Sequence, residues 1–205
     1  MMADPWPCGL ARAALLVCLS LAGGMVLAQD APDARRRLEL MGVQPSAARL
    51  VQFAAQGDRT VVELLLRSGV DVNAAEPLRQ VRALHNAAAQ GRLQLVKNLL
   101  ARGAQIDARD WRGNTALILA AYGGHAVVVD TLVAHGASLA AVSEEGISVL
   151  NAALYSGEDA LALRLLAAGA RPSVHPVAGA TIDIARRAGR QAVVQALAGL
   201  TGEAP

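Results

Sequence analysis

The stretch DWRGNTALILAAYGGHAVVVDTLVAHGASLA, residues 110–140, decides the fold because it holds one whole structural unit. Asp110 and Gly113 form a turn signal at its start. Two apolar runs follow over residues 115–121 and 127–134, each long enough for a short helix. Glycines separate the two runs and end the second one. The stretch therefore predicts a turn followed by a helix–turn–helix unit.

Five units of this kind follow one another along the chain. The glycines that separate the two helices of each unit are Gly57, Gly91, Gly124, Gly157 and Gly189, at steps of 34, 33, 33 and 32 residues. In four units a second glycine follows twelve residues later, at Gly69, Gly103, Gly136 and Gly169. Aliphatic pairs four residues apart precede it and predict one apolar helix stripe. The second glycine is expected to end that helix in the left-handed conformation.

The period and the residue order resemble the ankyrin repeat family, which has a 33-residue period and a T-P-L-H-x-A signature. The third unit matches best, although Ala116 stands where the family has proline. The second unit carries Ala83-Leu84-His85 at the same place. The resemblance implies an all-α solenoid of stacked helix–turn–helix units with projecting β-turns, and a histidine that bonds to a neighbouring turn at His85. The units are expected at about 45–77, 78–110, 111–143, 144–176 and 177–201.

The N-terminal segment, residues 1–28, has the pattern of a secretory signal peptide. Arg12 precedes an apolar run over residues 13–27, and Ala28 offers a small residue at the cleavage site. A cleaved signal peptide implies export to the periplasm. The alternative is an uncleaved membrane anchor, for which the run is short. Residues 29–44 are expected to form a leader, mobile over 30–33, and then a capping helix.

The composition argues against several classes of function. The net charge of +2 offers no strong case for nucleic acid or an acidic membrane surface. Both cysteines lie inside the signal segment, and no two histidines have a metal-ligand spacing, so we expect no disulfide, metal or cofactor. Ser143, Glu144 and Glu145 lack a histidine placed to make a nucleophile. The sequence therefore predicts a protein that is not an enzyme.

The few aromatic residues outside the signal segment indicate a binding surface. They are Phe53, Trp111, Tyr122 and Tyr155. The ankyrin resemblance places the last three on the concave face, at a turn tip or on an exposed position of a first helix. Trp and Tyr dominate interface hot spots. The tyrosines have an alternative role, which is to pack over the alanines beside them.

The resemblance also places four polar residues at the tips of the third and fourth turns, and so on the same face. These residues are Arg112, Asn114, Glu144 and Glu145. We expect a monomeric, exported scaffold or accessory protein that binds another protein through this face. Two alternatives remain. One is a membrane-anchored structural protein with Arg35–Arg37 beside lipid headgroups, and the other is a secreted effector that acts on a host protein.

Overall fold

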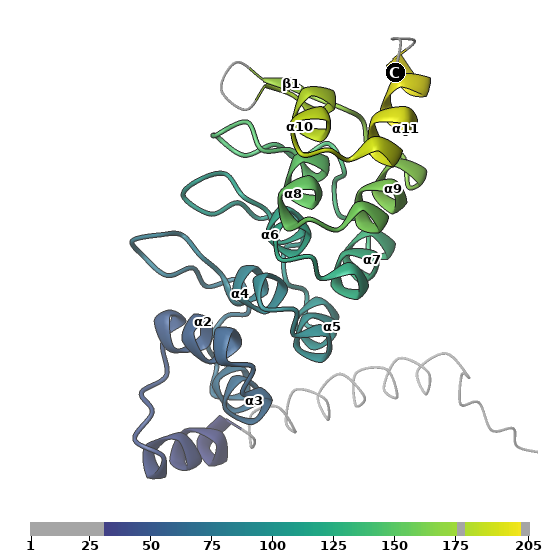
Figure 1. Cartoon of the computed structure of the whole chain (residues 1–205). Helices are drawn as coiled ribbons and strands as arrows, with labels where there is room; N and C mark the ends of the chain where they lie inside the picture. Colours follow the sequence, from purple (N-terminus) through teal and green to yellow (C-terminus); the bar gives the residue numbers. More distant parts are fainter. Residues whose placement is uncertain (1–30, 176–178, 202–205) are drawn as a thin grey trace, which may run out of the picture.

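The computed structural model describes residues 31–175 and 179–201. Within these residues a helix covers 31–40 and ten further helices form five consecutive pairs. The pairs are α2 (Ala47–Gln56) with α3 (Arg59–Arg67), α4 (Ala83–Ala89) with α5 (Leu93–Ala101), α6 (Ala116–Tyr122) with α7 (Ala126–Ala134), α8 (Val149–Ser156) with α9 (Asp159–Ala167), and α10 (Thr181–Arg187) with α11 (Gln191–Thr201). The first helices pack on one another in one row and the second helices lie in another (Figure 1). The predicted all-α solenoid is confirmed.

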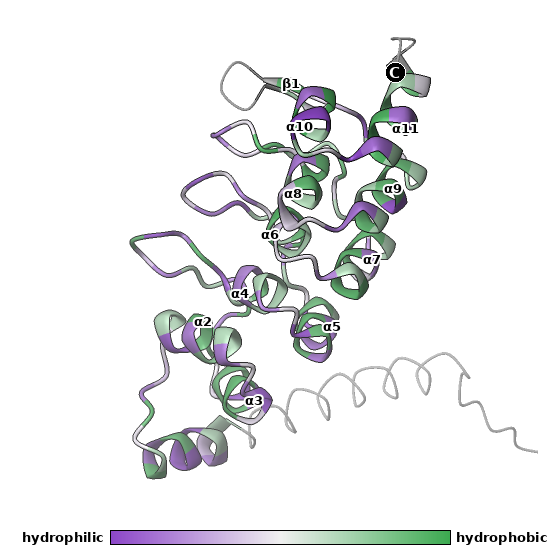
Figure 2. Cartoon of the chain, viewed as in Figure 1, coloured by the Kyte–Doolittle hydropathy of each residue, from purple (hydrophilic) through white to green (hydrophobic). Residues whose placement is uncertain are grey.

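The loops between the units project from the row of first helices (Figure 1) and contain the β structure of the described residues. In the last loop, β1 (Val174–His175) pairs antiparallel with β2 (Gly179–Ala180). Two earlier loops close with a single bridge each, Ala75 with Arg82 and Val142 with Ser148. The loops are largely hydrophilic, whereas the helices carry hydrophobic stripes (Figure 2). This contrast follows from burial of the stripes between neighbouring units.

Small and aliphatic residues build one continuous core along the stack. Ala87, Ala88, Ala120 and Ala121 on the first helices have no exposed surface. Alanine lets neighbouring first helices approach closely. No helix pair could bury its apolar face alone, so each unit depends on its neighbours for stability.

Glycines allow the turns between helices, in two different ways. Gly136 ends a second helix at φ +87°, and a β-carbon there would meet nothing within 4 Å. Gly91 has φ +65°, and its β-carbon would lie only 2.7 Å from Nδ1 of His125. At Gly136 the positive φ is the only feature that favours glycine. At Gly91 the side chain of the next unit also requires the empty space.

The helix over residues 31–40 covers the exposed end of the first unit. Its Ala34 and Leu38 are fully buried, and Nε of Arg35 donates a hydrogen bond of 3.0 Å to the Ser68 carbonyl. Residues 31–33 are helical, so the expected mobile leader is wrong for these three residues. Pro32 is tolerated in a first helical turn, and Asp33 pairs with Arg37 one turn later at 3.1 Å.

The signal segment, residues 1–28, lies outside the described residues. Within the described ranges, no helix is both long and apolar enough to span a membrane.

Candidate functional site

Hydrogen bonds join the tips of neighbouring projecting loops. The Trp111 N–H donates to the Arg79 carbonyl at 3.0 Å, and the Glu144 N–H donates to the Arg112 carbonyl at 2.9 Å. The Arg109 guanidinium donates to the Val142 carbonyl at 2.8 Å. These bonds hold together, in register, the loops at the start of the second, third and fourth units, which we call the second, third and fourth loops. Side chains at the tips are therefore presented on a connected surface.

The third loop is shaped by Asp110. Its carboxylate accepts hydrogen bonds from the N–H groups of Arg112 and Asn114, at 2.9 and 2.8 Å. The side-chain amide of Asn114 also donates to it, at 3.2 Å. An aspartate that bonds to the backbone two residues on is a common way to close a turn. Asn114 is half-buried and supports the turn, while Trp111 and Arg112 remain exposed.

Trp111 and Arg112 are linked to the fourth loop. Trp111 is 51% exposed, and the Arg112 guanidinium carbon lies 4.6 Å from its ring centroid. Nη1 of Arg112 also lies 3.6 Å from Oε1 of Glu145. A cation–π contact at an exposed site contributes about 0.5–1 kcal/mol, and an exposed ion pair contributes a similar amount or less. Together these contacts order side chains that would otherwise be mobile.

Tyr122 and Tyr155 lie on neighbouring first helices, α6 and α8. They are 57% and 47% exposed, and their ring centroids are 6.3 Å apart with the planes tilted by 57°. This separation and tilt are typical of a favourable aromatic pair. The tyrosines thus contact each other, and each keeps about half of its surface open. We call Trp111, Arg112, Tyr122, Glu145 and Tyr155 the aromatic surface.

A groove of about 240 Å³ opens within the aromatic surface, between the third and fourth loops. It is lined by Arg112, Asn114, Ile118, Leu119, Tyr122, Glu145 and Ile147. Four of the predicted site residues line it, while Trp111, Glu144 and Tyr155 lie outside its lining. Ile118, Leu119 and Ile147 were not predicted as site residues. Leu119 stands three residues before Tyr122 on α6, so helical spacing could have indicated it.

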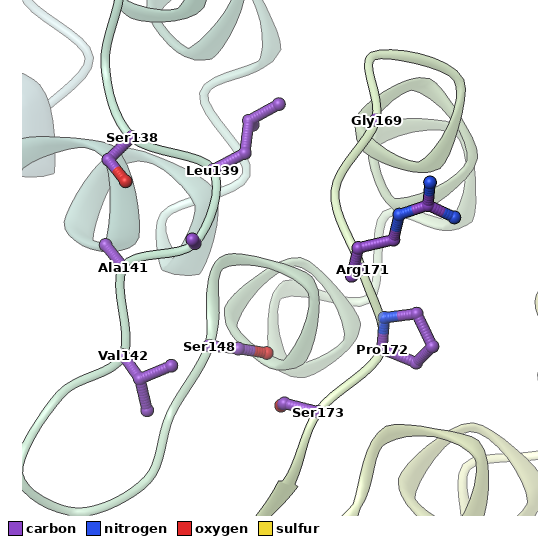
Figure 3. A pocket seen from close by; sticks show the side chains of 10 residues that line it. Ser138, Leu139, Ala141, Val142, Ser148, Gly169, Arg171, Pro172 and Ser173 are labelled. Carbon is purple, nitrogen blue, oxygen red and sulfur yellow. The ribbon is translucent and has the colours of Figure 1, made fainter.

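A second cavity, of about 450 Å³, lies between the residue 138–148 loop and residues 169–173 (Figure 3). Ser148 and Ser173 point toward one another across it. Both hydroxyls have structural partners, because Ser148 accepts from the Asn151 N–H at 3.2 Å and Ser173 lies 3.4 Å from the Thr181 hydroxyl. Its charged lining residue, Arg171, turns its guanidinium away from the cavity. This lining does not form a recognisable catalytic arrangement.

His85 has the structural role that the ankyrin resemblance implies. Nε2 of the buried His85 donates to the Ala108 carbonyl at 2.9 Å, and Nδ1 accepts from the Arg82 N–H at 3.1 Å. Burial lowers the pKa of His85, because the charged form loses hydration. Nε2 of His125 donates to the Ala89 carbonyl at 3.0 Å.

The side chain of His175 lies outside the described residues. Across the described ranges, no three His, Cys, Asp or Glu side chains are grouped closely enough to hold a metal ion.

The ankyrin repeat model, described as three copies of the repeat, matches residues 50–142 and 84–176. The two matches together cover more than half of the chain and extend over the first four helix pairs, from within α2 to beyond α9. The chain belongs to the ankyrin repeat family. This membership supports a module for protein–protein interaction.

Several relatives of this ankyrin-repeat chain are named as inhibitors. It is 36% identical over 93 residues to the cyclin-dependent kinase 4 inhibitor B of Bos taurus, covering 43% of this chain and 71% of the relative. It is 38% identical over 72 residues to the human cyclin-dependent kinase inhibitor 2A, covering 35% and 46%. It is also 38% identical over 71 residues to a mouse 2-5A-dependent ribonuclease, covering 35% and only 10%. In each case the similarity extends over less than half of this chain.

Proposed function

We propose that this ankyrin-repeat protein binds another protein through the aromatic surface. The observation that carries the proposal is the half-exposed Tyr122–Tyr155 pair on neighbouring helices, beside Trp111 and Arg112. Rigid aromatic side chains bury much apolar area on binding and lose little conformational entropy. Their mutual contacts order them before a partner arrives, which reduces the entropy lost on association.

The groove indicates what the partner presents at this point. Its lining includes Ile118, Leu119 and Ile147 together with the Arg112–Glu145 ion pair. An aliphatic side chain of the partner fits such walls, and polar backbone groups beside it can reach the ion pair. An apolar centre with a polar rim is the usual anatomy of a protein interface.

The protein would act by occupying its partner and not by catalysis. Relatives named as kinase inhibitors agree with action by binding. The aromatic surface holds no nucleophile paired with a base, and no metal or cofactor is needed for the proposed role. A scaffold, an inhibitor and an accessory protein all work in this way.

We further propose that residues 1–28 direct export of the protein to the periplasm and that this segment is then cleaved off after Ala28. The support is the sequence of residues 1–28, with one arginine, an apolar run and a small residue at the cleavage point. Mass spectrometry of the purified protein tests this, and a mature N-terminus at Gln29 is expected. Retention of residues 13–27 would instead support the membrane-anchored alternative.

The binding proposal is tested by pull-down from a periplasmic extract. The variant Trp111→Ala/Tyr122→Ala/Tyr155→Ala should lose the partner because it removes the three exposed aromatic side chains. A matched control, Leu40→Ala/Val127→Ala/Leu200→Ala, removes three other exposed apolar side chains and should keep it. Circular dichroism must show both variants folded. Equal recovery of the partner by both variants would contradict the assignment of the aromatic surface.

A further inference from the structure

A second groove, of about 700 Å³, lies on the row of second helices. It spans from the helix over residues 31–40, across α3, to α5. Its lining residues, which we call the basic groove, are Arg37, Arg59, Thr60, Glu63, Leu64, Arg67, Asn98 and Arg102. None of them belongs to the aromatic surface.

The basic groove has four arginines against one carboxylate, a net charge of +3 among its lining residues. The surrounding chain has the same sign. Residues 31–112 carry thirteen basic and eight acidic residues, whereas residues 113–201 carry five basic and six acidic residues. The positive charge of the solenoid is thus concentrated in its first units. A recess lined by charges of one sign attracts ligands of the opposite sign.

Two of the arginines in the basic groove have ion-pair partners. Arg102 on the α5 side pairs with Glu63 of α3, and Arg37 pairs with Asp33 within its own helix. The Arg59 guanidinium, at the first turn of α3, has no hydrogen bond or ion pair to any residue that the structure describes. The groove therefore combines positioned guanidinium groups with one that is open to a ligand. Guanidinium groups match the two oxygens of a carboxylate.

The dimensions of the groove suit an extended peptide. Arg59 and Arg67 stand at the two ends of α3, and eight residues of helix separate them by about 12 Å. An extended peptide advances about 3.3 Å per residue, so carboxylates three or four residues apart reach both ends. The buried Leu64 and the half-buried Glu63 lie between them.

We propose that the basic groove binds an extended acidic segment of a partner protein, whose carboxylates contact Arg59 and Arg67 at the two ends of α3 and Arg37 of the helix over residues 31–40. This site is separate from the aromatic surface, so the two can be occupied at once.

The test is a fluorescence anisotropy titration of the full chain with a labelled ten-residue peptide that has glutamate at every second position. The same peptide with glutamine at those positions is the uncharged control. We expect binding of the glutamate peptide at low salt, weakening as ionic strength rises. Failure of the glutamate peptide to bind, or equal binding of the glutamine peptide, would overturn the proposal.

Matched variants distinguish binding in the basic groove from a general effect of the protein's net charge. Arg37→Gln/Arg59→Gln removes one ion-paired and one open arginine at the groove. Arg164→Gln/Arg171→Gln removes the same charge at the other end of the chain, where Arg164 pairs with Asp130. The groove variant should weaken binding about tenfold or more, and the control by less than about threefold. Equal weakening by both would overturn the proposal in favour of a non-specific charge effect.

Two further measurements distinguish the alternatives. The variant Trp111→Ala/Tyr122→Ala/Tyr155→Ala should bind the glutamate peptide as well as the unaltered protein does, which makes the two proposed surfaces independently testable. Vesicles of phosphatidylcholine with and without phosphatidylglycerol test a lipid surface. Binding to the anionic vesicles without binding to the glutamate peptide would overturn the proposal and assign the groove to membranes.

Discussion

His85 and Asn151 occupy the same position in the second and fourth units, six residues before the glycine that separates the helices. Both are buried, at 1% and 0% exposure. His85 bonds to the Ala108 carbonyl of the next turn and to the Arg82 N–H. Neither side-chain amide atom of Asn151 has a hydrogen-bond partner among the described residues.

The repeat therefore dictates burial of the side chain at this position but not its hydrogen bonding. The third unit places Ile118 there, with no polar group to satisfy. A buried polar group stabilises the fold when it is paired and destabilises it when it is not. We therefore expect polar bonds at this position to join the second unit to its neighbour, whereas the fourth unit has none at this position.

Removal of the polar joint at His85 should have the largest effect. His85→Leu keeps an apolar side chain in the site but leaves the Ala108 carbonyl and the Arg82 N–H without their partner. We expect the free energy of unfolding to fall by about 3 kcal/mol, since buried groups left unpaired are costly. Urea unfolding followed by far-UV circular dichroism measures it. A loss below about 1 kcal/mol would show that the bonds contribute little.

A second joint, between Gly91 and His125, should give the next largest effect. In Gly91→Ala the added β-carbon is strained by the positive φ and also clashes with the His125 ring. In Gly136→Ala the positive φ is the only source of strain. We expect losses of about 2 kcal/mol or more for Gly91→Ala and about 1 kcal/mol for Gly136→Ala. Thermal unfolding of the pair measures the difference. Equal losses would mean that His125 moves aside without penalty.

Acidification should weaken the second unit through His85. Its folded-state pKa lies below the ordinary value of 6.5, so the unfolded chain binds the proton more readily. Stability is therefore full above pH 6.5 and falls as the pH drops from 6.5 toward the lowered pKa. The slope from this one group is at most about 1.4 kcal/mol per pH unit.

The effect is isolated by comparing unfolding of the unaltered protein and His85→Leu at pH 7.5 and 5.5. The difference in stability between the two proteins should shrink at the lower pH. An unchanged difference would rule out His85 as the source of the pH dependence.

The fourth unit should respond in the opposite direction and by the smallest amount. Asn151→Leu replaces an unpaired buried amide by an apolar group of similar size, which is neutral or stabilises by about 1 kcal/mol. Asn86→Leu is the matched control, because the Asn86 amide donates to the Val51 carbonyl at 3.0 Å. Urea unfolding should show a loss for Asn86→Leu only. Destabilisation by Asn151→Leu would contradict the view that Asn151 contributes no bond.

Much of the architecture could be predicted from spacing alone. The glycine positions and the aliphatic pairs placed the helices, because a helix must end where its apolar stripe ends and glycine follows. The start of the first helix could not be predicted in the same way. Pro32 and Asp33 are residue types that are common in non-helical leaders. The segment is helical because Ala34 and Leu38 are buried against the first unit, and this burial is visible only in the structure.

The candidate site was predictable in part for a similar reason. The repeat register places Tyr122 and Tyr155 one unit apart on neighbouring first helices, and in the structure their ring centroids lie 6.3 Å apart. The register does not reveal that Asn114 bonds to Asp110, or that Arg112 stacks on Trp111 and pairs with Glu145. Those contacts depend on side-chain rotamers, which spacing does not specify.

The sequence by itself determined the solenoid, because a 33-residue period with paired apolar helices has stacking as the way to bury its surface. It also places His85 and Asn151 at the same repeat position, six residues before the glycine that separates the helices. The tertiary structure decided which buried polar groups find partners and which arginines gather in one groove. These outcomes depend on distances between atoms of different units, and a difference of one or two ångströms separates a hydrogen bond from an unpaired group.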